Sequence, residues 1–266
     1  MEFNDAVKVN PALNRLRIQP FAPGINRDEL VSQVEEALEH PDKVDQGLHP
    51  HMCVPAVLQS YLAQTDPEEF VELVGELASP EGVAETASGH SLFRIEDSLL
   101  DDGTDRNLME RLMQAAIFDG AERAAGALRG SYSSLHHTSD GTEATGLGTW
   151  QTQEMLRQLT NDPTWTKSNP DSTVLDRASD EEPIPVVLKT GKGRGHQMLL
   201  TDITDGVVTL QDPEGEFAMP FEGSKLDGEG HQIMSVEAFE KVFEKAYLKS
   251  EQLPPEFRDP STWMMG

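Results

Sequence analysis

Hydrophobic residues in the first 160 positions recur with the spacing of amphipathic helices. A helix is expected within 27–40, where apolar side chains recur every four residues. A second helix is expected to begin near position 53, because the apolar residues from Val54 to Leu62 fall on one helix face and Pro55 suits a first turn. Cys53 therefore lies at the N-terminus of this second helix.

The same spacing continues along the chain toward position 160. A helix is expected within 65–82, with Asp66 as its N-cap. Two more are expected within 105–128 and from Thr149 onward, and the Gly-, Ser- and Thr-rich stretch 130–148 between them is typical of a loop. This part of the chain is thus predicted to be mainly helical.

The pattern changes after the polar segment 161–183. Asp205-Gly206 is a strong hairpin signal between two apolar runs, so this half is predicted to be an antiparallel sheet. A last helix is expected from its cap at Ser235 to Ala246. The expected strands are four short runs rich in β-formers: IPVVLK (184–189), HQMLLTDI (196–203), GVVTLQ (206–211) and EFAMPF (216–221).

These elements predict an α+β fold made of two lobes. Residues 1–47 are expected to form an N-terminal extension, 48–160 a helical lobe, 161–250 a lobe built on the antiparallel sheet, and 251–266 a C-terminal tail. A cleft is expected between the two lobes.

The net charge of the chain narrows the classes of molecule expected to bind this protein. The chain has 47 acidic and 21 basic residues, for a net charge of −26, and such a surface repels nucleic-acid phosphates and anionic lipid. Neither nucleic acid nor membrane is therefore expected as a partner. A solvated acidic surface is the simpler interpretation of the charge, and a basic substrate or partner is the alternative.

The N-terminal residues lack the basic segment and apolar run of a Sec signal peptide. No apolar stretch approaches the ~18 residues that span a bilayer. We therefore expect a soluble protein, either cytoplasmic or exported without a Sec signal peptide.

The single cysteine is the first candidate for chemistry. A helix N-terminus stabilises negative charge, so position 53 favours the thiolate, which is the nucleophilic form; a buried structural cysteine is the alternative. In papain-type chains a histidine follows the cysteine by roughly 130–150 residues. His196 follows Cys53 by 143 residues, after a glycine and at the start of a predicted strand.

A third group must orient the imidazole of His196, and Asp212 at the end of the hairpin partner strand is the first candidate. In an ideal hairpin turning at Asp205-Gly206, however, Asp212 falls opposite Leu199, on the other face from His196. A bulge or an early end to the ladder would bring Asp212 to the imidazole. Otherwise Gln211, on the His196 face, is the alternative.

These residues resemble the papain-like cysteine peptidases, and within them the peptidase domains of bacteriocin-processing exporters. In that family the cysteine opens a helix as Cys-x-Pro-Ala, as in CVPAVL here. A Gly-His strand, a short turn and a strand ending in Asp-Pro follow, as in GHQMLLTDITDGVVTLQDPEG. The final helix MSVEAFEKVFEKAY is also similar. The resemblance covers about residues 45–65 and 184–247; it implies a papain-like fold with Cys53, His196 and Asp212 as catalytic residues.

The resemblance also implies an oxyanion donor. In that family a glutamine six residues before the cysteine donates to the oxyanion, whereas here Gln46 precedes Cys53 by seven residues. A one-residue loop insertion would preserve the role of Gln46, because the role requires only a donor about 3 Å from the oxyanion. His49 or His51 is the alternative donor.

Together these features predict a cysteine peptidase that cleaves a protein or peptide amide and needs no cofactor. A transferase or glutamine deamidase with the same thioester chemistry is the first alternative, and a non-catalytic binding module with an acidic surface is the second. The cluster His49-x-His51-x-Cys53 is compatible with a soft metal such as zinc, but the sequence has no second ligand pair at zinc-finger spacing. His136-His137 is expected at the surface.

Overall fold

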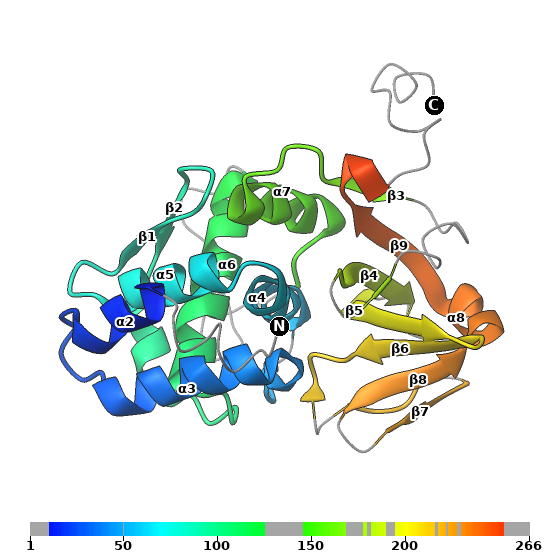
Figure 1. Ribbon diagram of the computed structural model, residues 1–266, viewed down its shortest axis with the longest axis horizontal. Coiled ribbons are helices and arrows are strands. Elements are labelled where there is room, and N and C mark those ends of the chain that lie inside the picture. The colour runs from blue at the N-terminus through cyan, green and yellow to red at the C-terminus, as the bar shows by residue number, and fades with distance from the viewer. Residues whose placement is uncertain are drawn as a thin grey trace, which may run out of the picture.

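A group of helices lies beside a seven-stranded antiparallel sheet in the computed structural model (Figure 1). The mixture of helices and antiparallel strands confirms the predicted α+β class. The structure describes residues 11–49, 51–125, 146–168, 178–179, 182–189, 195–215, 218–221, 223–227 and 230–252. Most of the predicted loop 130–148, with His136-His137, lies outside these residues.

All five helices predicted in the first 160 residues are confirmed. The Asp66 carboxylate accepts a hydrogen bond from the Glu69 N–H at 3.2 Å, which confirms its role as an N-cap. The sequence pattern does not predict α2 (Pro11–Ile18) or the hairpin of β1 (Val83–Glu85) and β2 (Ser91–Phe93). The five are α3 (Arg27–Glu39), α4 (Cys53–Thr65), α5 (Pro67–Ala78), α6 (Leu108–Ala124) and α7 (Thr149–Thr160).

The large sheet has the strand order β3-β9-β4-β5-β6-β8-β7. The predicted strands near 184–189, 196–203 and 206–211 are confirmed, and both Asp205 and Gly206 adopt positive φ, as the two-residue turn requires. The strands are β3 (Thr166–Ser168), β4 (Ile184–Lys189), β5 (Gly195–Thr204), β6 (Val207–Gln211), β7 (Ser224–Leu226), β8 (His231–Ser235) and β9 (Phe243–Leu248).

Two predictions in this half are wrong. Ser235 caps α8 (Val236–Val242) as expected, but the helix stops there, and Phe243 begins β9 between β3 and β4. Pairing with strands on both sides outweighs the local helical pattern. The expected strand 216–221 is absent from its described part, 218–221, where Pro220 has no N–H to donate to a ladder.

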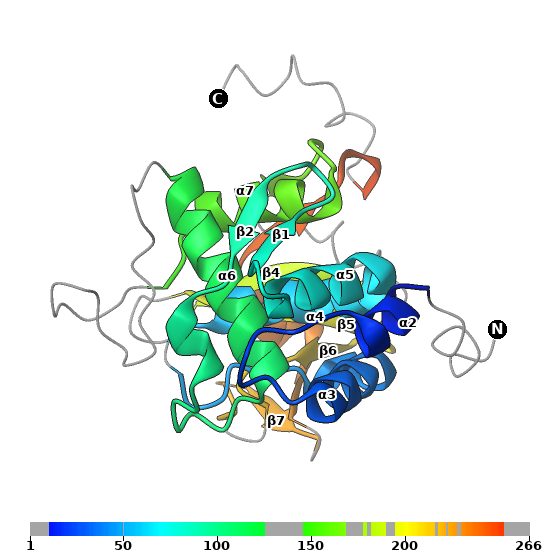
Figure 2. The same ribbon diagram turned by 90° about the vertical axis from the view of Figure 1, so that its left-hand side faces the viewer.

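Helix α4 lies between the sheet and the other helices. Every residue from Val54 to Ala63 is buried, so this helix is enclosed on all sides rather than along one stripe. One apolar core joins α4 and its neighbouring helices to one face of the sheet through Val187, Leu199 and Tyr247. A second core lies on the other face, against α8. Figure 2 shows the helices in front of β4, β5 and β6.

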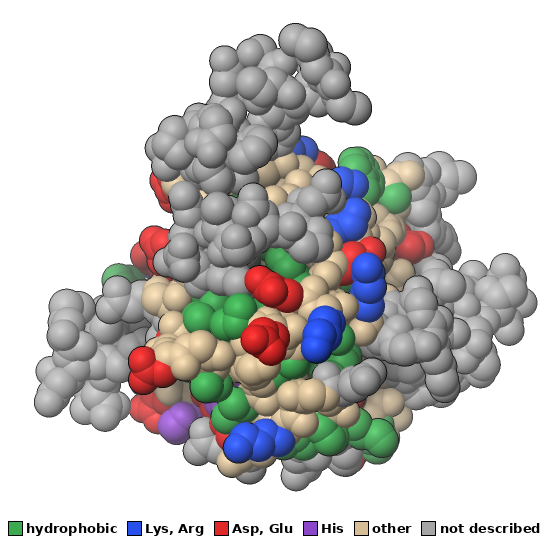
Figure 3. All heavy atoms as spheres, turned by 90° about the vertical axis from the view of Figure 1, so that its right-hand side faces the viewer, with side chains coloured by type: hydrophobic (Ala, Val, Ile, Leu, Met, Phe, Trp, Pro, Cys, Tyr) green, Lys and Arg blue, Asp and Glu red, His purple; other side chains and the backbone are tan. Residues whose placement is uncertain are grey.

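Among the described residues, the structure contains no helix that is both long and apolar enough to cross a membrane. On the face seen in Figure 3, which looks onto the sheet side of the molecule, basic side chains lie mainly in a strip to the right of the centre, and acidic side chains lie at the left, in the centre and at the right. Both signs of charge are therefore present on this face.

The net charge of −26 predicts that salt stabilises the fold. Raising NaCl from low ionic strength toward physiological strength shortens the Debye length to ~8 Å and screens repulsion among the surplus acids, so the midpoint of thermal unfolding should rise. The measurement is differential scanning calorimetry across NaCl concentrations. NaCl is preferred to sulfate, which strengthens apolar burial by exclusion. A midpoint that falls with moderate NaCl would contradict the repulsion argument.

Candidate active site

Cys53 is the first residue of α4, as the sequence predicts, and its side chain is partly exposed. The N-cap residue Met52 contributes no side-chain hydrogen bond to the helix start. Pro55, in the first turn, has no N–H. The N–H groups of Cys53 and Val54 are therefore the ones that the helix start directs beside the sulfur.

His196 brings the sulfur and a carboxylate together. It lies in β5, and its Nε2 is 2.8 Å from Oδ1 of Asp212. The Cys53 side chain also lies close enough to this imidazole to raise its pKa. The three residues separated by 143 and 16 positions in sequence thus meet at one imidazole.

The electrostatics of this imidazole favour its protonated form. Burial opposes protonation of His196, but the hydrogen bonds and negative charges of Asp212 and Cys53 outweigh burial and raise the pKa of His196 well above its ordinary value. An imidazolium held beside the sulfur stabilises a thiolate there. The same sulfur adds to the effect of burial in raising the pKa of Tyr247 on β9.

A β-bulge explains why Asp212, not Gln211, reaches His196. Near the turn the ladder follows the ideal hairpin register, but the pairing shifts between Leu200 and Asp202, so that Leu199 pairs with Gln211. Thr201 is the extra residue. The shift turns Asp212 to the face of β5 that carries His196.

Gln211 points to the other face of the sheet. Its Nε2 donates to Ser60 Oγ at 2.8 Å and to the Pro41 carbonyl at 2.9 Å, and its Oε1 accepts from Gln64 at 3.1 Å. These bonds tie β6 to α4 and to the segment before it. Gln211 is therefore a structural residue, and the alternative of Gln211 as the orienter of His196 is wrong.

The loop that carries Gln46 lies against the residue after Asp212. The Gln46 N–H donates to the Pro213 carbonyl at 2.6 Å, and its side chain is buried. Among the described residues, Oε1 of Gln46 has no hydrogen-bond partner. An amide whose buried end lacks a partner is available to a ligand, because rotation about its last bond exchanges donor and acceptor.

The alternative oxyanion donors also lie in this loop. His49 is buried, and His51 is partly buried with a φ of 72°, an uncommon backbone conformation for a residue other than glycine. Among the described residues no group of three or more His, Cys, Asp or Glu side chains is arranged to hold a metal ion. His49, His51 and Cys53 thus do not form such a group.

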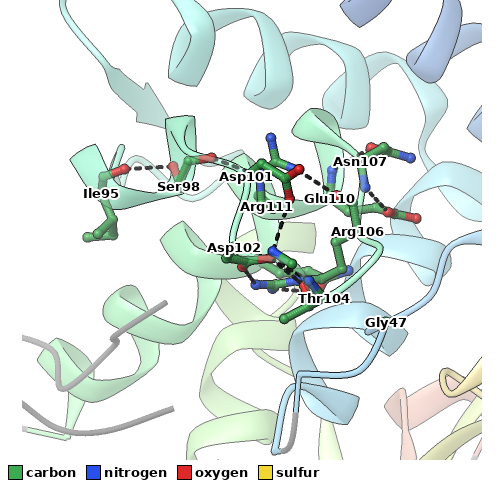
Figure 4. A network of polar contacts seen from close by, with 12 residues as sticks. Gly47, Ile95, Ser98, Asp101, Asp102, Thr104, Arg106, Asn107, Glu110 and Arg111 are labelled. Carbon is green, nitrogen blue, oxygen red and sulfur yellow. Dashed lines mark hydrogen bonds and ion pairs between the residues drawn. The ribbon is translucent and has the colours of Figure 1, made fainter. Parts of the chain in front are cut away.

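A buried polar network at the start of α6 holds this loop in place (Figure 4). Arg106 pairs with Asp102 at 2.5 Å, with almost no exposure of either side chain. The Leu48 N–H donates to the Thr104 carbonyl at 2.8 Å. The carbonyl of Asp45 accepts from Gln114 Nε2 at 2.6 Å. The residues on both sides of Gln46 are therefore anchored to α6 and the segment before it.

Three further residues at the site escape sequence reasoning. The Glu214 N–H donates to Asp212 Oδ1 at 3.0 Å. Burial raises the pKa of the Glu214 side chain, and the nearby His196 opposes this shift. The ring of Phe221 lies 5.9 Å from that of His196. Gln232 on β8 donates to Asp212 Oδ2 at 2.9 Å. For Gln232, the sequence signal is a polar residue at a buried position of HQIMS, a strand whose side chains point alternately to the two faces of the sheet.

Comparison of the chain with protein-family models, with curated proteins and with solved structures gave no match. The chemistry of the site is therefore argued from its own residues. A thiol at a helix start, a shared imidazole and a buried carboxylate are the components of nucleophilic acyl transfer.

The first test of this site is the reactivity of the thiol. At pH 6, iodoacetamide should alkylate Cys53 more than about ten-fold faster than free cysteine, which is mostly protonated there. Because the pKa of His196 is raised, this advantage is present at pH 6 and is lost as pH rises through that raised value. Intact-mass spectrometry reports a single site, since Cys53 is the only cysteine.

The control for the thiol test is a second His–Asp pair. His231 Nδ1 lies 2.7 Å from Asp227 Oδ2. We expect His196→Ala to remove the rate advantage of Cys53 and His231→Ala to retain it. Alkylation only after denaturation would instead identify Cys53 as a buried structural residue.

The second test concerns the loop of Gln46. Gly47 has a φ of +56°, and a Cβ there would lie 1.9 Å from the Thr104 carbonyl oxygen. Gly47→Ala should therefore lower the free energy of unfolding by more than about 1 kcal/mol and displace Gln46. Urea unfolding measures the loss.

Gly24→Ala is the matched control for this loop, because Gly24 also has positive φ, +94°, but no atom lies within 4 Å of its would-be Cβ. This control measures the loss of unfolding free energy that comes from placing alanine at positive φ, without the steric clash of its Cβ. Equal losses in the two variants would show that the close approach of Gly47 to Thr104 contributes nothing to stability.

Proposed function

We propose that this protein is a papain-like cysteine peptidase that cleaves a protein or peptide amide. The observation that carries the proposal is the imidazole of His196, which interacts with the Cys53 side chain and lies 2.8 Å from Asp212. A nucleophile, a base and a group that orients the base, each in contact with the next, form the arrangement that activates a thiol.

The proposed reaction has two acyl-transfer steps. The Cys53 thiolate attacks the amide carbonyl, and a C–S bond forms. The carbonyl oxygen becomes an oxyanion, which then collapses as the C–N bond breaks and the His196 imidazolium gives its proton to the leaving amine. Water then attacks the thioester while the neutral His196 imidazole accepts a proton from it, and the C–S bond breaks, which releases the acid product and restores the Cys53 thiolate beside the His196 imidazolium.

Two groups are suited to bind the oxyanion. The backbone N–H of Cys53 is at the start of α4, where intrahelical acceptors are absent and Met52 adds no cap. The Gln46 amide is buried, and its Oε1 has no described partner. Donors positioned before the reaction stabilise the developing charge without reorganisation.

Asp212 is suited to hold the imidazole. Its Oδ1 accepts from His196, which fixes Nε2 as the protonated ring nitrogen and leaves Nδ1 to serve the sulfur. Its carboxylate is buried and also accepts from the Glu214 N–H and from Gln232. A buried charge that accepts several hydrogen bonds is stabilised as an anion.

The same thioester also serves a transferase or a glutamine deamidase, because these reactions differ from peptide cleavage only in the substrate amide or in the group that resolves the acyl-enzyme. Incubation with a mixed peptide library, followed by mass spectrometry, separates them. New N-termini support the peptidase. Conversion of glutamine side chains to glutamate without chain cleavage supports the deamidase, and incorporation of an added primary amine supports the transferase.

Variants test whether Cys53 and His196 carry the activity. Cys53→Ala should remain folded but abolish turnover, and His196→Ala should lower it by at least about 10³-fold. His231→Ala is the matched control and should retain turnover. If Cys53 reacts rapidly with iodoacetamide but no library yields a product, the proposed peptidase function is overturned in favour of a binding module.

A further inference from the structure

The second oxygen of Asp212 has its own partner on a third strand. Gln232 on β8 is fully buried, and its Nε2 donates to Asp212 Oδ2 at 2.9 Å. The first oxygen, Oδ1, accepts from His196. The two oxygens of one carboxylate are therefore held by partners on two different strands.

The sheet register accounts for this arrangement. β6 lies between β5 and β8, and Gln232 pairs with Leu210, two residues before Asp212. Residues two apart on a strand share a face, so Gln232 lies on the Asp212 face. His196, Asp212 and Gln232 consequently form a line of polar groups across three adjacent strands, on the face that carries the second apolar core.

Gln232 also holds the segment that contacts the imidazole. Its Nε2 donates a second bond to the Met219 carbonyl at 2.9 Å, and its Oε1 accepts from Ser224 Oγ at 2.6 Å and from the Phe221 N–H at 3.4 Å. The Phe221 ring lies 5.9 Å from the His196 ring. One amide therefore supports both the carboxylate behind the imidazole and the aromatic ring beside it.

We propose that Gln232 is a positioning residue for the His196–Asp212 pair, fixing the carboxylate through Oδ2 and the ring of His196 through Phe221. Both amide hydrogens and the amide oxygen are used, so the side chain has one favoured orientation. An amide carries no charge at any pH, so the hydrogen bond that Gln232 donates to Asp212 does not depend on a titration of Gln232 itself. The catalytic consequence of this role rests on the proposed function.

Two titratable groups interact with the pair directly, and two more lie beside neighbours of the pair. Cys53 approaches from α4, and Glu214 from the turn after β6. Tyr247 on β9 is coupled to the sulfur. Asp45, in the loop of Gln46, lies against Gly215. A pH profile of the thiol therefore reports on a defined set of neighbours.

The experiment measures the pH dependence of Cys53 alkylation by iodoacetamide in Gln232→Leu. Loss of the bond to Oδ2 should destabilise the Asp212 anion. The protonated form of His196, which pairs with the thiolate, should then be less stable. The acid limb of the rate profile should then move about one unit toward higher pH, which is roughly a ten-fold loss of rate on that limb. Circular dichroism checks that the variant is folded.

Gln232→Glu is the conservative variant, and it covers the case in which the leucine variant does not fold. When protonated, the introduced carboxyl group still donates to Asp212, so the acid limb should lie closer to that of the wild type. At higher pH two carboxylates would face each other, and the rate should fall below that of the wild type. A purely structural role for Gln232 does not predict opposite behaviour at the two ends of the profile.

Gln211→Leu is the matched control, because Gln211 is also a buried glutamine with several hydrogen bonds, but it contacts α4 rather than Asp212. It should lower stability without moving the acid limb. A Gln232→Leu profile that overlays the wild type, or equal shifts in both leucine variants, would overturn the positioning role alone. A wild-type thiol that alkylates like free cysteine at every pH would overturn the proposed function as well.

Discussion

The packing of the start of α4 against the start of β5 is the constraint on which the site depends. The helix is buried from Val54 to Ala63, between the sheet on one side and the neighbouring helices on the other. A helix enclosed in this way cannot slide without opening cavities on both sides, because close-packed interiors do not deform continuously. The position of the Cys53 sulfur relative to His196 is therefore fixed by apolar burial, far more than by the few polar contacts at the site.

Much of this arrangement is readable from the sequence. The helix that begins at Cys53, the Asp205-Gly206 hairpin and the strand that carries His196 follow from local periodicity and turn chemistry. The bulge at Thr201 does not, because no residue there marks it, yet its single extra residue decides which side chain faces the imidazole. Strand β9 is missed for a different reason: its apolar spacing also fits a helix, and only pairing with β3 and β4 decides between the two.

The same reasoning explains why Gln232 and Phe221 are not found from sequence. Their relation to Asp212 depends on which strand lies beside β6, and neither β7 nor β8 has a strong local signal. In the structure, Asp212 accepts hydrogen bonds from His196, Gln232 and the Glu214 N–H. Three donors around one buried carboxylate offset the cost of removing it from water. The polar line across β5, β6 and β8 is thus tolerated on the face that carries the second apolar core because each member satisfies the next.

The loop that enters α4 shows how the helical part of the chain contributes to the same site. Leu48 is anchored to Thr104, and the Gln46 N–H to Pro213, so this loop connects the polar network at the start of α6 with the turn after Asp212. His51, two residues before the thiol, has positive φ, a conformation that persists only where the surroundings over-determine it. The Arg106–Asp102 pair therefore belongs to the polar network that anchors the loop leading to Cys53.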